Sequence, residues 1–105
     1  AAHADSIGLA ADFEKVGDWY EIPYGCLYHP DCANMLAAGR MISSDGWAWD
    51  VTRVIPVCAL TGQAAGLAAA QIAATGQTAA VLPIDGLQKA LREQGVVLHR
   101  ADLAE

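Results

Sequence analysis

Charged residues are scarce in this sequence. Asp, Glu, Lys and Arg make up 17% of its 105 residues, against about a quarter in ordinary soluble domains, whereas hydrophobic residues make up 54%. So little charge cannot cover the surface of a small globule, and we expect part of that surface to contact a partner subunit, a membrane or the rest of a larger protein. A start at Ala1 without Met fits a fragment or a processed product.

Basic residues are few and dispersed. The chain has six Lys and Arg residues and a net charge of -6, and its cations form no run that could follow a phosphate backbone. We therefore expect no nucleic-acid partner.

Cysteine is also rare, and its count of three is odd. The spacing has no disulfide framework, and no basic segment followed by an apolar one marks a signal peptide, so we expect a cytoplasmic protein. Cys26, His29 and Cys32 offer three soft ligands in one loop, but zinc needs a fourth ligand at a suitable distance. A turn with two buried thiols is the simpler interpretation, and we predict no metal site.

The first half of the chain gives weak structural signals. Residues 1–17 predict mostly irregular structure, and the β-forming residues of 19–22 predict a strand. Pro23 and Gly25 interrupt that strand, so 26–28 would form a second short strand or the rest of a broken one. A short buried strand is predicted over 35–38, ending at Gly39, and an ordered loop over 41–53.

A long helix without charge is the strongest signal. Pro56 suits its first turn and Gly76 the position just past its end. Small residues recur on one side, which would let another backbone approach closely: Gly62, Gly66, Ala69, Ala70 and Ala73. We expect a core helix hidden nearly all round, because the abundant Ala together with Gln63 and Gln71 make it a weak membrane span.

The C-terminal part predicts a second, shorter helix. Leu87, Ala90 and Leu91 have helical spacing, Gly95 is its stop, and the expected limits are 84–94. Residues 96–98 would follow as a terminal strand or an extended tail.

The start of the long helix is the best candidate for binding chemistry. Its free N–H groups and the positive end of its dipole would stabilise an electron-rich or anionic group, and Arg53 would add a full charge. From the residues alone, pairing of Arg53 with Asp50 or Asp45 is the favoured interpretation.

Several motifs together resemble one family. In order and spacing, the chain is similar to the C-terminal region of bacterial FAD-dependent oxidoreductases distantly related to the succinate dehydrogenase and fumarate reductase flavoproteins. The matching segments are 20–24 (YEIPY), 34–43 (NMLAAGRMIS), 53–58 (RVIPVC), 62–66 (GQAAG) with 68–70, and more weakly 5–8 and 87–95. They cover almost the whole chain.

This resemblance implies an α/β or α+β fragment of an incomplete FAD/NAD(P)-binding-type fold, with short strands, one long buried Ala/Gly-rich helix and a shorter C-terminal helix. Residues 1–33 would be a remnant of the substrate or cap region, 34–76 the flavin-facing strand, loop and helix, and 77–105 the C-terminal helix and tail. Gly39 and Arg40 would lie beside the ribityl and phosphate side of the cofactor, and the helix start near flavin N1 and O2. The implied cofactor-binding residues are Gly39, Arg40, Arg53, Val54, Ile55, Pro56 and Val57.

One expected motif is missing. The G-x-G-x-x-G turn that holds the pyrophosphate occurs nowhere in the chain, and residues 44–49 (SDGWAW) differ from the smaller, His-containing loop expected there. FAD would therefore bind in the complete protein and not tightly to this chain, which alone would be inactive. Expected partners are a missing N-terminal FAD-binding portion, supplied in trans in a split protein, or further copies of the chain. The alternative is a self-associating interaction domain without catalysis.

Overall fold

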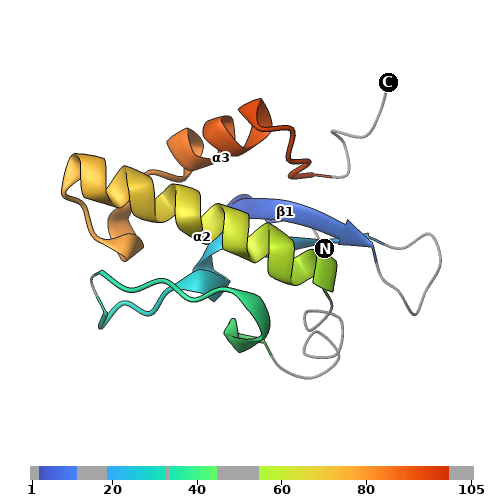
Figure 1. Ribbon diagram of the computed structural model, residues 1–105, viewed down its shortest axis with the longest axis horizontal. Helices are drawn as coiled ribbons and strands as arrows, with labels where there is room; N and C mark the ends of the chain where they lie inside the picture. Colours follow the sequence, from blue (N-terminus) through green and yellow to red (C-terminus); the bar gives the residue numbers. More distant parts are fainter. Residues whose placement is uncertain (1–2, 12–18, 33, 45–54, 100–105) are drawn as a thin grey trace.

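The structure is a computed structural model that describes residues 3–11, 19–32, 34–44 and 55–99 (Figure 1). These residues form an antiparallel pair of strands and two α-helices, which confirms the α+β prediction. The elements are β1 (Ser6–Ala11), β2 (Trp19–Pro23), α2 (Ile55–Thr75) and α3 (Ile84–Glu93), with three 3₁₀ turns, η1 (Tyr24–Leu27), η2 (Gly39–Met41) and η3 (Ala79–Val81).

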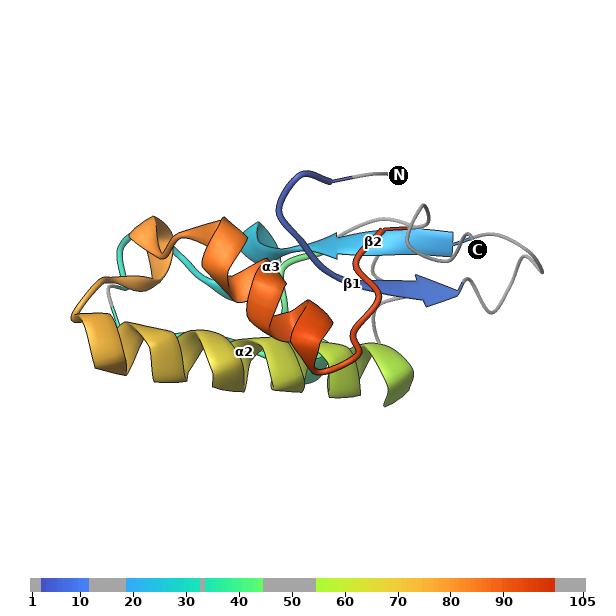
Figure 2. The same ribbon diagram turned by 90° about the horizontal axis from the view of Figure 1, so that it is seen from above.

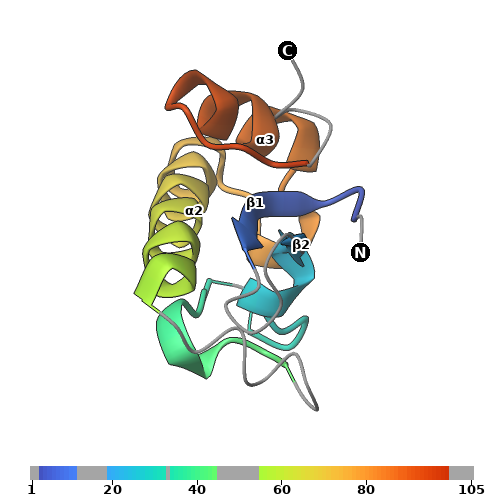
Figure 3. The same ribbon diagram turned by 90° about the vertical axis from the view of Figure 1, so that its right-hand side faces the viewer.

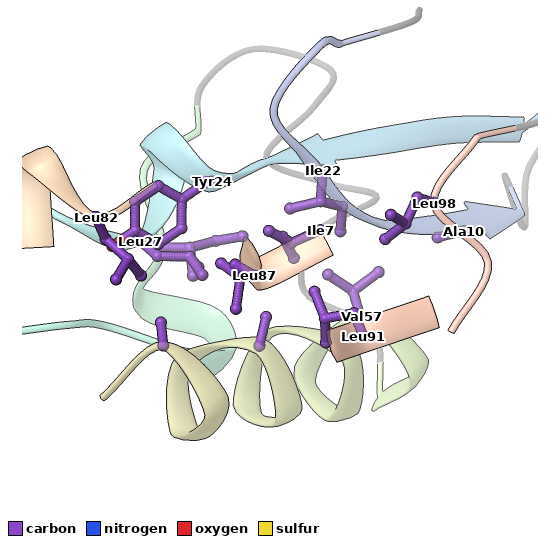
Figure 4. Packing of buried hydrophobic residues seen from close by; sticks show 13 residues of the cluster. Ile7, Ala10, Ile22, Tyr24, Leu27, Val57, Leu82, Leu87, Leu91 and Leu98 are labelled. Carbon is purple, nitrogen blue, oxygen red and sulfur yellow. The ribbon is translucent and has the colours of Figure 1, made fainter. Parts of the chain in front are cut away.

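The helices cover the strand pair. Helix α2 runs beneath β1, and α3 contacts both α2 and β1 (Figure 2). Seen end on, α2 and the strands form two layers, and α3 lies across one end of the space between them (Figure 3). The core fills this space with Ile7, Ile22, Tyr24, Leu27, Val57, Leu87, Leu91 and Leu98 (Figure 4).

Strand β1 corrects the prediction of mostly irregular structure over 1–17. It pairs with β2 in a register that joins Leu9 to Glu21 and Ala10 to Tyr20. Its sequence has no polar and apolar alternation because residues 6–10 are all buried. Gly8 and Ala10 also have low strand propensity, so tertiary contacts stabilise this strand.

Residues 96–98 form an extended tail beside β1, one of the two predicted forms. The Leu9 N–H donates to the Val97 carbonyl at 2.8 Å, and the Ser6 hydroxyl donates to the Leu98 carbonyl at 2.6 Å. The Gln88 side chain of α3 donates to the Ala4 and Ser6 carbonyls, both at 2.9 Å. The C-terminal part of the described chain is thus fastened to its beginning.

Both helix ends are where the sequence predicts them. Gly76 has φ +74° and donates its N–H to Ile72, so α2 ends in a left-handed residue that favours glycine. Gly95, with φ +91°, follows α3 in the same way. Pro56 occupies the first turn of α2, where no helical N–H is required.

Two predicted short strands are wrong. Residues 26–28 begin in the 3₁₀ turn η1, and 35–38 lack regular structure. One hydrogen bond joins the two segments, from the Ala37 N–H to the Leu27 carbonyl at 2.7 Å. Further along the chain, the Ser43 N–H donates to the Cys26 carbonyl at 3.1 Å. The apolar residues of 35–38 are typical of a buried strand. However, Met35 is 55% exposed, and 35–38 does not pair with either strand of the described sheet. Most of the predicted loop 41–53 lies outside the described residues.

The expectation that the long helix is hidden nearly all round is also wrong for the described chain. Only Val57, Thr61, Ala64 and Ala68 of α2 are buried, in one stripe facing the core. Helix α2 is long and apolar enough to cross a membrane by length and composition, yet only 22% of its most apolar window is buried. Its opposite side, which we call the outer face, exposes Gly62, Gly66, Ala69 and Ala73.

Candidate functional site

A hydrogen bond joins the two segments that the sequence marks for cofactor binding. The Gly39 N–H donates to the Thr61 hydroxyl oxygen at 2.9 Å. That hydroxyl lies 2.9 Å from the Val57 carbonyl and 3.1 Å from the Cys58 carbonyl, so it donates back to its own helix while accepting from Gly39. Buried Thr61 thereby fixes η2 against the first half of α2.

Gly39 adopts a conformation that few other residues accept. Its φ is +78°, in the left-handed region, and no atom lies within 4 Å of the place where a Cβ would be. The backbone conformation, and not crowding, is therefore what favours glycine here. Arg40 and Met41, which follow it in η2, are both exposed.

Among the described residues, the first turn of α2 is exposed at Ile55 and Pro56 and carries no acidic side chain. Ile55 is 84% exposed, Pro56 is exposed and Val57 is buried in the core, and no Asp or Glu lies in the first turn. Its N–H groups and dipole can therefore interact with an electron-rich group from outside. Arg53 and Val54 lie outside the described residues, as do Asp45 and Asp50.

A groove of about 540 Å³ lies along the outer face of α2. It is lined by Asn34, Leu36, Ala65, Gly66, Ala69, Ile72 and Ala73. The sequence predicts that the small side chains admit another backbone, and residues 34–36 of the same chain lie at one border of this groove. On this face Gly66, Ala69 and Ala73 of α2 remain exposed.

A second pocket, of about 190 Å³, was missed in the sequence. It is lined by Cys26, Leu27, Tyr28, His29, Met35, Ala37, Met41 and Ser43. Burial, followed by the charge of Asp5, raises the pKa of the Cys26 thiol. The available signal was the clustering of four of the five Cys and Met residues between positions 26 and 41.

The structure does not assemble the three soft ligands considered for zinc. Cys32 does not line the pocket that contains Cys26 and His29. The His29 Nδ1 atom accepts the Asp31 N–H at 3.1 Å, and all three cysteines are free. Over the described residues, no group of three His, Cys, Asp or Glu side chains is close enough to hold a metal ion.

Comparison with known proteins identifies the family. A family model described as FAD dependent oxidoreductase matches residues 3–91, which is most of the chain. Comparisons with curated proteins and with solved structures gave no match. The matched range includes β1, β2, η2, α2 and nearly all of α3, and this chain therefore belongs to the family of FAD-dependent oxidoreductases.

Proposed function

We propose that this chain forms a wall of the flavin site of an FAD-dependent oxidoreductase, beside the isoalloxazine ring and the ribityl chain. The observation that carries the proposal is the hydrogen bond from Gly39 to Thr61, which holds η2 against α2. These are the two segments that the family resemblance assigns to the cofactor. The Thr61 hydroxyl joins them by accepting from Gly39 and donating to its own helix.

The residues at this surface suit the flavin end of FAD. The exposed start of α2 offers backbone N–H groups at Ile55 and Val57, while Pro56 has none to offer. A positive helix end whose first turn contains no acidic residue stabilises negative charge at flavin N1 and O2 and so favours the reduced form. When bound, FAD would supply hydride or electron transfer to or from an organic substrate.

The described residues do not suit the pyrophosphate and adenosine end. The chain has no G-x-G-x-x-G turn, and Arg40 is the single cation in η2. We therefore propose that residues 34–76 are the flavin-facing part, 1–33 a remnant of the substrate or cap region and 77–105 the C-terminal helix and tail. Tight FAD binding and turnover would require an N-terminal FAD-binding portion beyond this chain.

The direct test is to titrate the ¹⁵N-labelled chain with FAD and follow its amide NMR signals. Weak binding should shift Gly39, Arg40, Ile55 and Val57, and the absorption spectrum of the purified chain should contain no stoichiometric flavin. Shifts confined to other residues, or tight flavin binding by the isolated chain, would contradict the proposal.

A matched pair of variants sharpens this test. Thr61→Val removes the hydroxyl that joins η2 to α2, whereas Thr75→Val removes an exposed hydroxyl that bonds Gln71 near the other end of the same helix. We expect the first variant to weaken the FAD-induced shifts and the second to leave them unchanged. Equal effects would mean that the Gly39–Thr61 contact does not shape the flavin surface.

A second candidate function is a self-associating interaction domain without catalysis, favoured by the exposed outer face of α2. In that case further copies of the chain would cover this face, whereas in the first proposal the N-terminal portion would cover it. Light scattering separates the two. A concentration-dependent oligomer without FAD-induced shifts supports self-association, and a monomer with such shifts supports the flavin wall.

We further propose that the complete protein is a cytoplasmic member of the bacterial branch related to the succinate dehydrogenase and fumarate reductase flavoproteins. The motifs over 34–43, 53–58 and 62–66 support this relationship, and three free thiols suit a reducing compartment. The net charge of -6 argues against nucleic acid as a partner. Two glutamines and many alanines in α2 argue against a membrane.

A further inference from the structure

Three sulfur-containing residues line the smaller pocket. Cys26, Met35 and Met41 all line it, so it contains both methionines of the chain and one of the three cysteines. We call it the sulfur pocket. Its other lining residues are Leu27, Tyr28, His29, Ala37 and Ser43, so the sulfur atoms are the softest donors that it offers.

The backbone brings these residues together from separate segments. The hydrogen bonds from Ala37 to Leu27 and from Ser43 to Cys26 attach the segment 35–43 to η1. Met35 and Met41 therefore border the same cavity as Cys26, although they lie nine and fifteen positions further along the chain. Met35 is 55% and Met41 76% exposed, so an ion from solution can reach these two residues.

The donor set favours a soft cation. Thiolate and thioether sulfur select Cu(I), whereas carboxylates and carbonyls suit Mg²⁺ and Ca²⁺. Within the described part of the chain, no group of three His, Cys, Asp or Glu side chains forms a site for a harder ion. The His29 Nδ1 atom already accepts the Asp31 N–H, so the ring would have to change tautomer and give up this hydrogen bond before Nε2 could bind the ion.

We propose that the sulfur pocket binds one Cu(I) ion through the Cys26 thiolate and the thioethers of Met35 and Met41. The Cys26 thiol gives up its proton when its sulfur binds the ion, and each methionine donates a sulfur lone pair without any change in protonation. No electron transfer is involved, because copper enters and remains as Cu(I). Met41 belongs to η2, but the test of this site uses no FAD, so its failure is distinguishable from failure of the flavin proposal.

The test is an anaerobic titration of the 105-residue chain with Cu(I), in competition with the chromophoric chelator bicinchoninate. We expect one Cu(I) per chain. Met35→Leu/Met41→Leu, a double substitution that nearly conserves volume, should weaken binding by more than about tenfold, since loss of even an outer-shell partner of a metal ligand typically costs about 10- to 100-fold. Cys58→Ala, which removes a thiol from α2 outside the pocket, should leave the affinity unchanged.

Three results would overturn the proposal. They are no binding at one equivalent, equal affinity in the wild type and the double methionine variant, and loss of affinity in Cys58→Ala. X-ray absorption of the copper-loaded chain gives an independent check, because sulfur should be the only first-shell neighbour. A nitrogen ligand, or a shell that is the same in the double variant, would also exclude this site.

Discussion

The Gly39 amide donates a hydrogen bond to the hydroxyl of Thr61, a residue 22 positions further along the chain, at 2.9 Å. Thr61 is fully buried, and Gly39 is held in a left-handed conformation. The contact links η2 directly to a buried side chain of α2. Its removal should therefore have effects that stability measurements can detect.

Thr61→Val should destabilise the fold. The variant keeps the shape of the side chain but leaves the Gly39 N–H without an acceptor, and because this group is only partly buried we expect the low end of the usual cost, about 1 kcal/mol. Urea unfolding followed by circular dichroism measures the loss. Thr75→Val, at an exposed hydroxyl, is the control and should change the free energy of unfolding by less than about 0.5 kcal/mol.

Gly62→Ala and Gly66→Ala should each stabilise the isolated chain by about 1 kcal/mol, because alanine is the better helix former. Nothing lies within 4 Å of the Cβ that either substitution adds. The reverse change at another exposed position of α2, Ala70→Gly, should destabilise by a similar amount. Thermal unfolding of the three variants tests this, and a lower midpoint for Gly62→Ala or Gly66→Ala would mean that a second backbone already contacts the outer face.

Gln88→Leu should destabilise more than Gln63→Leu. The Gln88 amide donates to two backbone carbonyls near the start of the chain, Ala4 and Ser6, and their loss should cost about 1 to 3 kcal/mol. Gln63 is exposed and bonds only the exposed side chain of Gln94 among the contacts described, so its change should stay within about 0.5 kcal/mol. Urea midpoints that do not differ between the two variants would contradict this account of α3.

Cys26 should make stability fall in alkali. Burial, followed by the charge of Asp5, raises its pKa above the ordinary value of a thiol, so folding favours the neutral form. This contribution is complete below the pKa of the unfolded state and is lost as the pH rises through the higher pKa of the folded state.

The measurement is the urea midpoint of the wild type and of Cys26→Ala between about pH 7.5 and pH 10, around the usual thiol pKa. The wild type should lose more stability than the variant over this range. Burial also raises the pKa of Tyr24, but that residue is the same in both proteins and cancels in the comparison. Parallel curves would show that Cys26 ionises as freely when folded as when unfolded.

Local signals in the sequence predicted the helices well and the strands poorly. Pro56, Gly76 and Gly95 mark helix ends through their own backbone preferences, so no distant contact is needed to place them. Strand β1 depends on β2 and on Val97, which is 88 positions away from Leu9, and its Gly8 and Ala10 carry no strand signal. For 35–38 the sequence predicted a strand that the structure lacks, because apolar residues form a strand only where a neighbouring strand can pair with them.

The candidate site was predictable only in part. The resemblance marked Gly39 and the start of α2, but nothing local to either segment indicates that they touch. Thr61, which joins them, is the one polar member of the buried stripe that continues through Val57, Ala64 and Ala68. A polar residue at a core-facing helical position is a usable signal for such a contact. The sulfur pocket was missed because methionine was not counted as a ligand.

The attachment of the tail to β1 also bears on how this chain folds. The hydrogen bond between Ser6 and Leu98 closes a loop of 92 residues, and the Leu9 to Val97 bond closes one nearly as long. Contacts so distant in sequence form slowly, because the entropy of loop closure is lost before they form. During synthesis, the contacts of β1 with the tail must wait until the last described residues leave the ribosome, whereas its pairing with β2 needs only the chain up to Pro23.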